Sequence, residues 1–156
     1  MKKLLLIPFL SSLLLPSFAS ADSPSTNPST DIVKVSSKHN VKDTMDRFEK
    51  IVTKQGFTVF ARVDHRAGAK GVGLDMNDAE VLIFGNPKGG TMIMKLDPAA
   101  GLDLPLRVLA YTDNEGKTWL SYHNPQGLKN SYDVAKTPVI EKVEGGLAKL
   151  TAKAAE

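Results

Sequence analysis

The alternation of apolar and polar residues at the start of the folded part predicts a strand followed by a helix. Residues 31–36 read DIVKVS, the pattern of a strand with one buried face. Asn40 is a good N-cap, and Gly56 is placed to end a helix. Between them, apolar residues recur at the spacing of one helical stripe: Val41, Met45, Phe48 and Val52.

The middle of the chain predicts two strands and a short helix. Residues 57–65 (FTVFARVDH) are rich in β-branched and aromatic residues, which favours a strand. Residues 66–79 are glycine-rich and mixed, so we expect a short helix or a loop. The run VLIF at 81–84 is typical of a strand buried on both faces. Asn86-Pro87 then offers an N-cap with proline in the first turn, which predicts a helix ending at residue 94 or 95.

A hairpin and a last helix complete the pattern. Strands are expected at 104–112 and 117–123, because the DNEG segment between them has hairpin turn chemistry. Thr137-Pro138 starts a helix whose stripe is Ile140, Val143, Leu147, Leu150 and Ala154. Gly145-Gly146 lies inside it and costs about 1 kcal/mol per glycine relative to alanine. We expect close packing of that helix on the sheet to be the reason for the pair.

This order of elements predicts an α+β domain with a curved, mainly antiparallel sheet and helices on one face. Strict alternation in the second strand puts Val59 and Val63 on one face, with Phe60 and Arg62 on the other. The second face would carry Phe60 together with Leu109 or Tyr111, and Tyr122 is a further candidate. Such a face is too apolar to be simply solvated, so we expect a dimer interface or a ligand groove there.

Composition limits the class of protein. The chain has 156 residues, of which 42% are hydrophobic and 24% charged, as in one ordinary globular domain. It has no cysteine, which excludes a disulfide framework, a thiolate zinc site and a cysteine nucleophile.

The first 21 residues predict a secretory signal peptide. Lys2 and Lys3 form a basic start, residues 4–15 form an apolar core, and residues 19–21 (ASA) form a cleavage site. The alternative, a membrane anchor, is disfavoured because the apolar run is too short and is interrupted by prolines. We therefore expect export, to the periplasm first and to the medium as the alternative. No membrane association is expected after cleavage, and residues 22–30 (DSPSTNPST) are expected to be a flexible leader before one domain at 31–156.

Cleavage also removes most of the net charge. The full chain carries 20 basic and 17 acidic residues, or +3, and loss of Lys2 and Lys3 leaves 18 minus 17, or +1. There is no basic run with interleaved aromatics, so we predict no nucleic-acid partner.

Four blocks in order resemble the family called domain of unknown function 302. They are VDHRAGA at 63–69, LIFGNPKGGT at 82–91, GLDLPL at 101–106 and TWLSY at 118–122, within a resemblance that spans roughly 31–135. The resemblance implies a TBP-like α+β fold and a homodimer, and carries no established activity. It marks these positions: Asp64, His65, Gly85, Asn86, Pro87, Gly90, Thr91, Asp103, Leu104 and Pro105.

The marked polar residues predict a ligand groove. The candidate ligand-binding residues are His65, Asn86, Lys88, Gly90, Thr91 and Asp103. Each has a structural alternative: Asp64 and Asn86 are placed to cap the helices that follow them, and Asp103 to bond nearby backbone. The Asn86–Thr91 turn could bind an anion through its backbone amides, although it lacks the lysine position of a phosphate loop. We therefore expect a small binding or accessory protein with no cofactor.

Two other functions stay open. An enzyme is conceivable in which His65 acts as acid or base, Asp103 orients it and the Asn86–Thr91 turn donates to an anion. Copper binding is conceivable through His65 with Met92 or Met94, because thioether and imidazole are copper ligands. Two methionines at i and i+2 diverge on a helix, however, and core packing is the expected role of the methionines.

Overall fold

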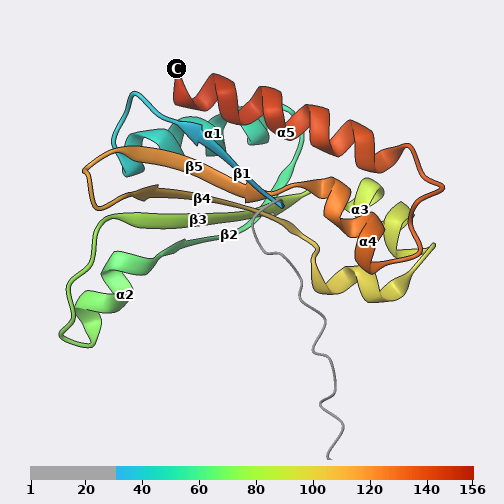
Figure 1. The fold of residues 1–156 in the computed structure, drawn as a ribbon, viewed down its shortest axis with the longest axis horizontal. Helices are drawn as coiled ribbons and strands as arrows, with labels where there is room; N and C mark the ends of the chain where they lie inside the picture. The colour runs from blue at the N-terminus through green and yellow to red at the C-terminus, as the bar shows by residue number, and fades with distance from the viewer. Residues whose placement is uncertain (1–30) are drawn as a thin grey trace, which may run out of the picture.

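A computed structural model describes residues 31–156, which form a five-stranded antiparallel sheet with helices packed on one face (Figure 1). The signal peptide and the leader expected at residues 1–21 and 22–30 lie outside the described residues. The strands lie in the order β1-β5-β4-β3-β2 across the sheet. Their bounds are β1 Ile32–Ser36, β2 Thr58–Asp64, β3 Ala79–Gly85, β4 Leu106–Thr112 and β5 Thr118–His123. The predicted α+β class and antiparallel sheet are confirmed.

Two long helices cover one face of the sheet, α1 (Val41–Lys54) and α5 (Val139–Ala155) (Figure 1). The shorter helices follow individual strands: α2 His65–Gly71, α3 Pro87–Met94 and α4 Leu128–Ser131, with 3-10 turns η1 Pro98–Leu102 and η2 Pro125–Gly127. The two 3-10 turns and α4 were not predicted, because three to five residues are too few to show a helical period. Within residues 31–156, no helix has the length and apolar character needed to cross a membrane.

The predicted stripe of α1 builds the main hydrophobic core. Asn40 caps this helix, its Oδ1 accepting from the Asp43 amide at 2.8 Å, and Gly56 follows it with φ +79°. The stripe residues are buried against β3, β4 and β5, and Phe84 of β3 meets the Phe48 ring edge-on at 5.3 Å between centroids. Part of α5 closes this core through Leu147, Ala154 and Ala155.

A second, smaller hydrophobic cluster is built around the short helices. It consists of Ile93, Ala100, Leu128, Val134 and Ile140, which come from α3, η1, α4, the segment before α5, and α5. The helix α5 therefore contributes to both clusters, through Ile140 to the smaller one and through Leu147 to the main core.

A bulge in β2 corrects the predicted faces of that strand. The register with β3 shifts between Val59 and Ala61, so the residues after Phe60 change sides. Arg62 pairs with Leu82 and lies on the helix-covered face, whereas Val63 is 41% exposed on the other face. Strict alternation gave the opposite assignment for both residues, because alternation cannot anticipate an extra residue.

The face of the sheet that the long helices leave open carries apolar side chains that are partly exposed. The expectation that β3 is buried on both faces is wrong, since Leu82 and Phe84 are buried but Val81 and Ile83 are partly exposed. Leu109, Tyr111 and Trp119 are also partly exposed, while Tyr122, a candidate for this face, is 6% exposed in the core. In Figure 1, the long helices lie on the other side of the sheet.

The glycine pair in α5 does not mark close packing. A Cβ atom added at Gly145 or Gly146 would meet nothing within 4 Å. The expected tight approach of helix to sheet is therefore wrong at this point, and the pair leaves open space beside α5 instead.

Arg62 joins α1 to the sheet through three carboxylates. Its Nη1 donates to Asp46 Oδ1 at 2.6 Å and to Glu49 Oε2 at 3.0 Å, and its Nε donates to Glu80 Oε2 at 2.6 Å. The Arg62 side chain is 24% exposed, so this network is partly shielded from solvent. Lys42 and then Arg62 hold the pKa of Asp46 below its ordinary value of 3.8.

We predict that Arg62→Met lowers the free energy of unfolding by about 1–3 kcal/mol at neutral pH, because three carboxylates lose their shared partner. Since the pKa of Asp46 is lower in the folded protein, the part of this stabilisation that Asp46 contributes is present above pH 3.8 and is lost as pH falls below that value. Urea unfolding at neutral and acidic pH measures both effects.

Arg66→Met is the matched control, because Arg66 is a partly exposed arginine whose Nη1 pairs with Asp78 at 2.6 Å outside the main core. Its loss should lower the free energy of unfolding clearly less than the loss of Arg62 does. Equal costs for the two variants would contradict the special role of Arg62.

Candidate functional site

His65 lies at one end of the sheet, outside any described cavity lining. It is the exposed first residue of α2, directly after β2. Asp64 caps this helix, its Oδ1 accepting from the Ala67 amide at 2.9 Å. Asp64 therefore caps the helix that follows it, as the structural alternative predicted.

Asp103 lies at the opposite end of the sheet from His65. His65 follows Asp64, which pairs with Glu80 at the start of β3, whereas Asp103 precedes Leu106, which pairs with Phe84 near the end of β3. The strand rises by four residue steps from Glu80 to Phe84, or roughly 13 Å. The hypothesis that Asp103 orients the His65 imidazole is therefore wrong, because the register keeps the two side chains apart.

Asp103 instead belongs to a small polar cleft. Its Oδ2 accepts from the Tyr132 hydroxyl at 2.7 Å, which raises the pKa of Tyr132, and its Oδ1 lies 3.6 Å from Arg107 Nη2. The histidine that shares this cleft of about 150 Å³ is His123, at the end of β5. The sequence analysis missed His123 as a neighbour of Asp103. The antiparallel register that pairs Thr112 with Thr118 would, if continued, place His123 opposite Arg107.

The start of α3 is fully capped by Asn86. Its Oδ1 accepts from the Lys88 and Gly89 amides at 3.0 and 3.3 Å, and its backbone carbonyl accepts from the Gly90 amide at 2.9 Å. These amides are the donors that an anion would need at this turn. The turn is therefore the capped helix start that was the structural alternative, and these amides already have acceptors within the chain.

The methionines do not share a site with His65. Met92 and Met94 follow β3, at the far end of the sheet from His65, and each lines a different hollow. Met92 and Met94 are 49% and 37% exposed, so the expected role of the methionines in core packing does not hold for this pair. It holds for Met45, which is buried. In the described part of the chain, no group of three or more His, Asp or Glu residues could hold a metal ion.

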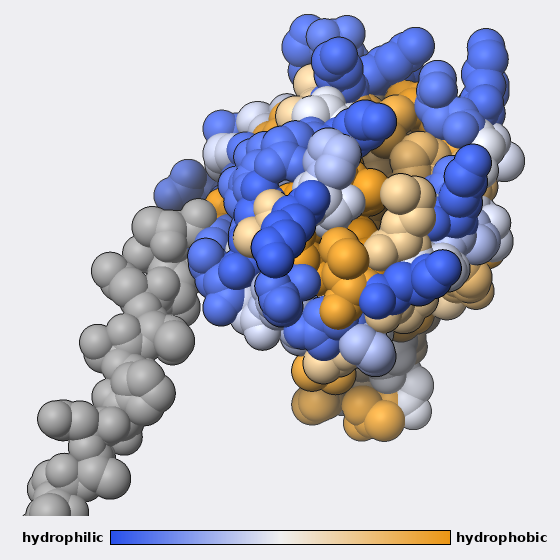
Figure 2. Space-filling view, turned by 90° about the vertical axis from the view of Figure 1, so that its right-hand side faces the viewer, coloured by the Kyte–Doolittle hydropathy of each residue, from blue (hydrophilic) through white to orange (hydrophobic). Residues whose placement is uncertain are grey.

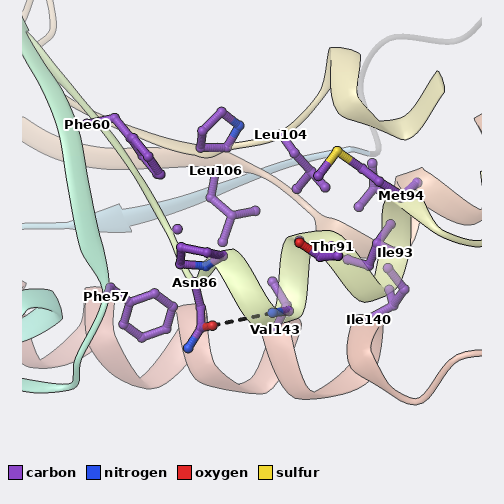
Figure 3. A pocket seen from close by; sticks show the side chains of 16 residues that line it. Phe57, Phe60, Asn86, Thr91, Ile93, Met94, Leu104, Leu106, Ile140 and Val143 are labelled. Atoms are coloured by element: carbon purple, nitrogen blue, oxygen red, sulfur yellow. Dashed lines mark hydrogen bonds between the residues drawn. The ribbon is translucent and has the colours of Figure 1, made fainter. Parts of the chain in front are cut away.

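The structure does bring Asn86, Gly90 and Thr91 to one cavity of about 330 Å³ beside α3. Figure 3 shows Phe57 next to Asn86, with Ile93, Met94 and Leu104 further along and Val143 and Ile140 rising from α5. Asn86 and Thr91 are the polar side chains of this lining. The rest of it is apolar or glycine: Phe57, Phe60, Gly85, Pro87, Gly89, Gly90, Ile93, Met94, Leu104, Pro105, Leu106, Leu128, Ile140 and Val143.

The cavity lies where the two hydrophobic clusters meet. Phe57, Leu106 and Val143 pack against the main core, whereas Ile93 and Ile140 belong to the smaller cluster, and all five line the cavity. The two clusters therefore leave a hollow at their junction, and the end of the sheet at Gly85 and Pro105 forms another wall.

A second hollow of about 360 Å³ adjoins this cavity between α3 and α5. The two share five wall residues: Phe57, Asn86, Gly89, Leu106 and Val143. Lys88 and Lys142 line the second hollow, as do Gly146 and Leu150. Figure 2 views the end of the molecule where α3 and α4 lie, and shows apolar surface with hydrophilic side chains around it. We call the two hollows together the α3 groove.

Four of the six candidate ligand-binding residues thus line one groove, namely Asn86, Lys88, Gly90 and Thr91. His65 and Asp103 lie elsewhere. The apolar majority of the lining was missed, because its members come from strands, helices and loops that no single sequence period connects.

One family model and several curated proteins match this chain. The sequence model described as "Domain of unknown function DUF302" matches residues 33–154. The chain is 40% identical over 126 residues to the fluoride-specific ion channel FluC 1 of Brucella suis, a match that covers 80% of this chain and 50% of that protein. The corresponding FluC 1 of Brucella abortus is also 40% identical, with 47% of its length covered. The chain therefore spans about half the length of these curated relatives.

A crystal structure of an uncharacterized conserved DUF302 protein from Bacillus stearothermophilus has a similar fold. The TM-score is 0.64 at 20% identity, covering 81% of this chain and 96% of that one. Because the family match spans nearly all of the described domain, the chain belongs to the family of the domain of unknown function DUF302.

Proposed function

We propose that this domain is a binding or accessory protein that holds a small, mainly apolar ligand in the α3 groove. The observation that carries the proposal is the cavity of about 330 Å³ whose lining is apolar except for two side chains. Ligand sites are typically concave and apolar, with volumes of about 300–1,000 Å³ and a few polar groups that fix orientation. The α3 groove meets each of these criteria.

Asn86 and Thr91 are the groups that would orient a ligand. The helix cap uses the Asn86 Oδ1 atom, so its amide nitrogen is the atom left to donate to a bound molecule. The Thr91 hydroxyl lies one turn along the same helix and can donate or accept. A ligand with a carbonyl or hydroxyl group near its apolar part would satisfy both.

The channel activity named for the Brucella relatives is not carried over to this chain, because the match covers about half of those proteins. Catalysis by His65 is not proposed, because Asp103 and the Asn86–Thr91 turn lie at the other end of the sheet. Copper binding by His65 with Met92 or Met94 is not proposed either, because the two methionines also lie at the other end of the sheet from His65. Export to the periplasm stays a prediction from the N-terminal sequence.

We predict that filling the groove weakens binding of a neutral apolar probe. A Cβ added at Gly90 would meet only Leu104 Cδ1, at 4.0 Å, and one added at Gly146 would meet nothing within 4 Å. Gly90→Leu and Gly146→Leu therefore add a side chain to the wall of each hollow with no clash at its Cβ atom, and both raise helix propensity. Titration with N-phenylnaphthylamine, followed by its fluorescence, should show saturable binding to the wild type and affinities at least about tenfold weaker in both variants.

Gly145→Leu is the matched control. Gly145 is the neighbouring glycine on α5, has equally open surroundings and lies outside the groove lining. This variant should bind the probe as the wild type does. An absence of saturable binding to the wild type, or equal weakening in all three variants, would overturn the proposal.

We also propose that the domain forms a homodimer through the open face of its sheet. That face exposes Ile32, Phe60 and Val63 at 46%, 54% and 41%, beside the partly exposed Tyr111 and Trp119. An apolar sheet face of this kind supports association between chains.

Val63→Glu should weaken the dimer by more than about tenfold, because it buries an unpaired carboxylate in the interface. Val72→Glu is the control, since Val72 is 74% exposed next to the end of α2. Sedimentation velocity over a range of concentrations measures both. A wild type that stays monomeric, or a Val63→Glu variant that dimerises as well as the wild type, would contradict the dimer.

A further inference from the structure

We infer that the ligand of the α3 groove is a single-chain amphiphile with an anionic head group, of the chemical class of a medium-chain fatty acid. The inference rests on the proposed binding function and adds the chemistry of the ligand. It depends on how apolar and charged side chains are distributed between the two hollows.

The hollow nearest the end of the sheet suits an apolar chain. It is lined by no charged residue, and its deepest members, Ile93 and Ile140, are 2% and 0% exposed. A hydrogen-bonding or charged group placed against these side chains would lose its hydration without gaining a partner. This part of the α3 groove therefore fits the tail of the ligand.

The second hollow, between α3 and α5, is lined by two positively charged side chains. Lys88 from α3 and Lys142 from α5 line it from opposite walls, and they are the charged residues of the whole groove lining. No acidic residue lines either hollow. The head group that complements this arrangement is an anion held between two ammonium groups.

Nearby carboxylates do not neutralise these lysines. On α5, Glu141 pairs with Lys129, and Glu144 Oε2 accepts from Gln126 Nε2 at 2.8 Å. Within residues 31–156, no carboxylate forms an ion pair with Lys88 or Lys142. Both ammonium groups are therefore available to a ligand.

The helix start does not supply an alternative anion site. The amides of Lys88, Gly89 and Gly90 are already used by the Asn86 cap. A compact anion such as inorganic phosphate would thus meet only two flexible side chains, whereas an amphiphile also buries its tail. This favours an amphiphile over a free inorganic anion.

Decanoate and decanol test the inference, because they share a tail and differ in the head group. Displacement of N-phenylnaphthylamine at low salt should show that the wild type binds decanoate about tenfold more tightly than decanol. The Lys88→Gln/Lys142→Gln double variant should lose this preference through weaker binding of decanoate. Added salt should reduce the preference in the wild type, because the lysines are exposed.

The control is Lys50→Gln/Lys70→Gln, which removes the same charge from exposed positions on α1 and α2 outside the groove lining. It should keep the wild-type preference. A charge-reversed variant, Lys88→Glu/Lys142→Glu, should instead prefer decylammonium to decanoate.

The outcomes separate the two proposals. If the wild type binds decanol and decanoate equally, the anionic head group is overturned and the binding function stands. If the probe binds but neither compound displaces it, the amphiphile is overturned and the binding function stands. If the probe itself shows no saturable binding, both are overturned. If the control loses the preference as fully as the Lys88→Gln/Lys142→Gln variant, the preference comes from net charge and the assignment to these two lysines is overturned.

Discussion

The packing of α5 against two separate hydrophobic clusters is the constraint on which the rest of the structure depends. Its 17 residues form a rod of about 25 Å, long enough to lie along the sheet and continue past its end. Leu147 and Ala154 close the main core with α1, while Ile140 holds the smaller cluster of short helices. Because α5 runs as one continuous helix from Val139 to Ala155, it holds the two clusters apart along its length, and the α3 groove lies between them.

The chemistry of the groove follows from local choices at its rim. The side-chain oxygen and the backbone carbonyl of Asn86 accept hydrogen bonds from the first amides of α3, so these amides are not free to bind an anion. Charge is supplied instead by Lys88 and Lys142, which lie in one of the two hollows. Gly90 and Gly146 keep side chains out of the space, and a Cβ at Gly146 would meet nothing. The α3 groove is therefore apolar along most of its lining and basic in the hollow that Lys88 and Lys142 line.

Sequence patterns predicted the elements well and the burial of strand faces less well, most clearly in β2. The α1 stripe, the Asn40 and Asn86 caps and the β4–β5 hairpin obey local rules, so each was recognisable from a few neighbouring residues. The bulge at Phe60 broke the period of two and reversed Arg62 and Val63. No local rule marks such an insertion, because the extra residue is defined by the register with β3, and that register is a long-range pairing.

By itself, then, the sequence determined the α+β class, the order of the elements and the capped start of α3, because these depend on periodicity and on contacts between near neighbours. Only the tertiary structure decided which candidate residues meet. It separated His65 from Asp103 by the length of β3, placed His123 beside Asp103, and gathered Phe57, Ile93 and Val143 around one cavity. Such meetings depend on strand register and helix packing between distant segments, which no local pattern specifies.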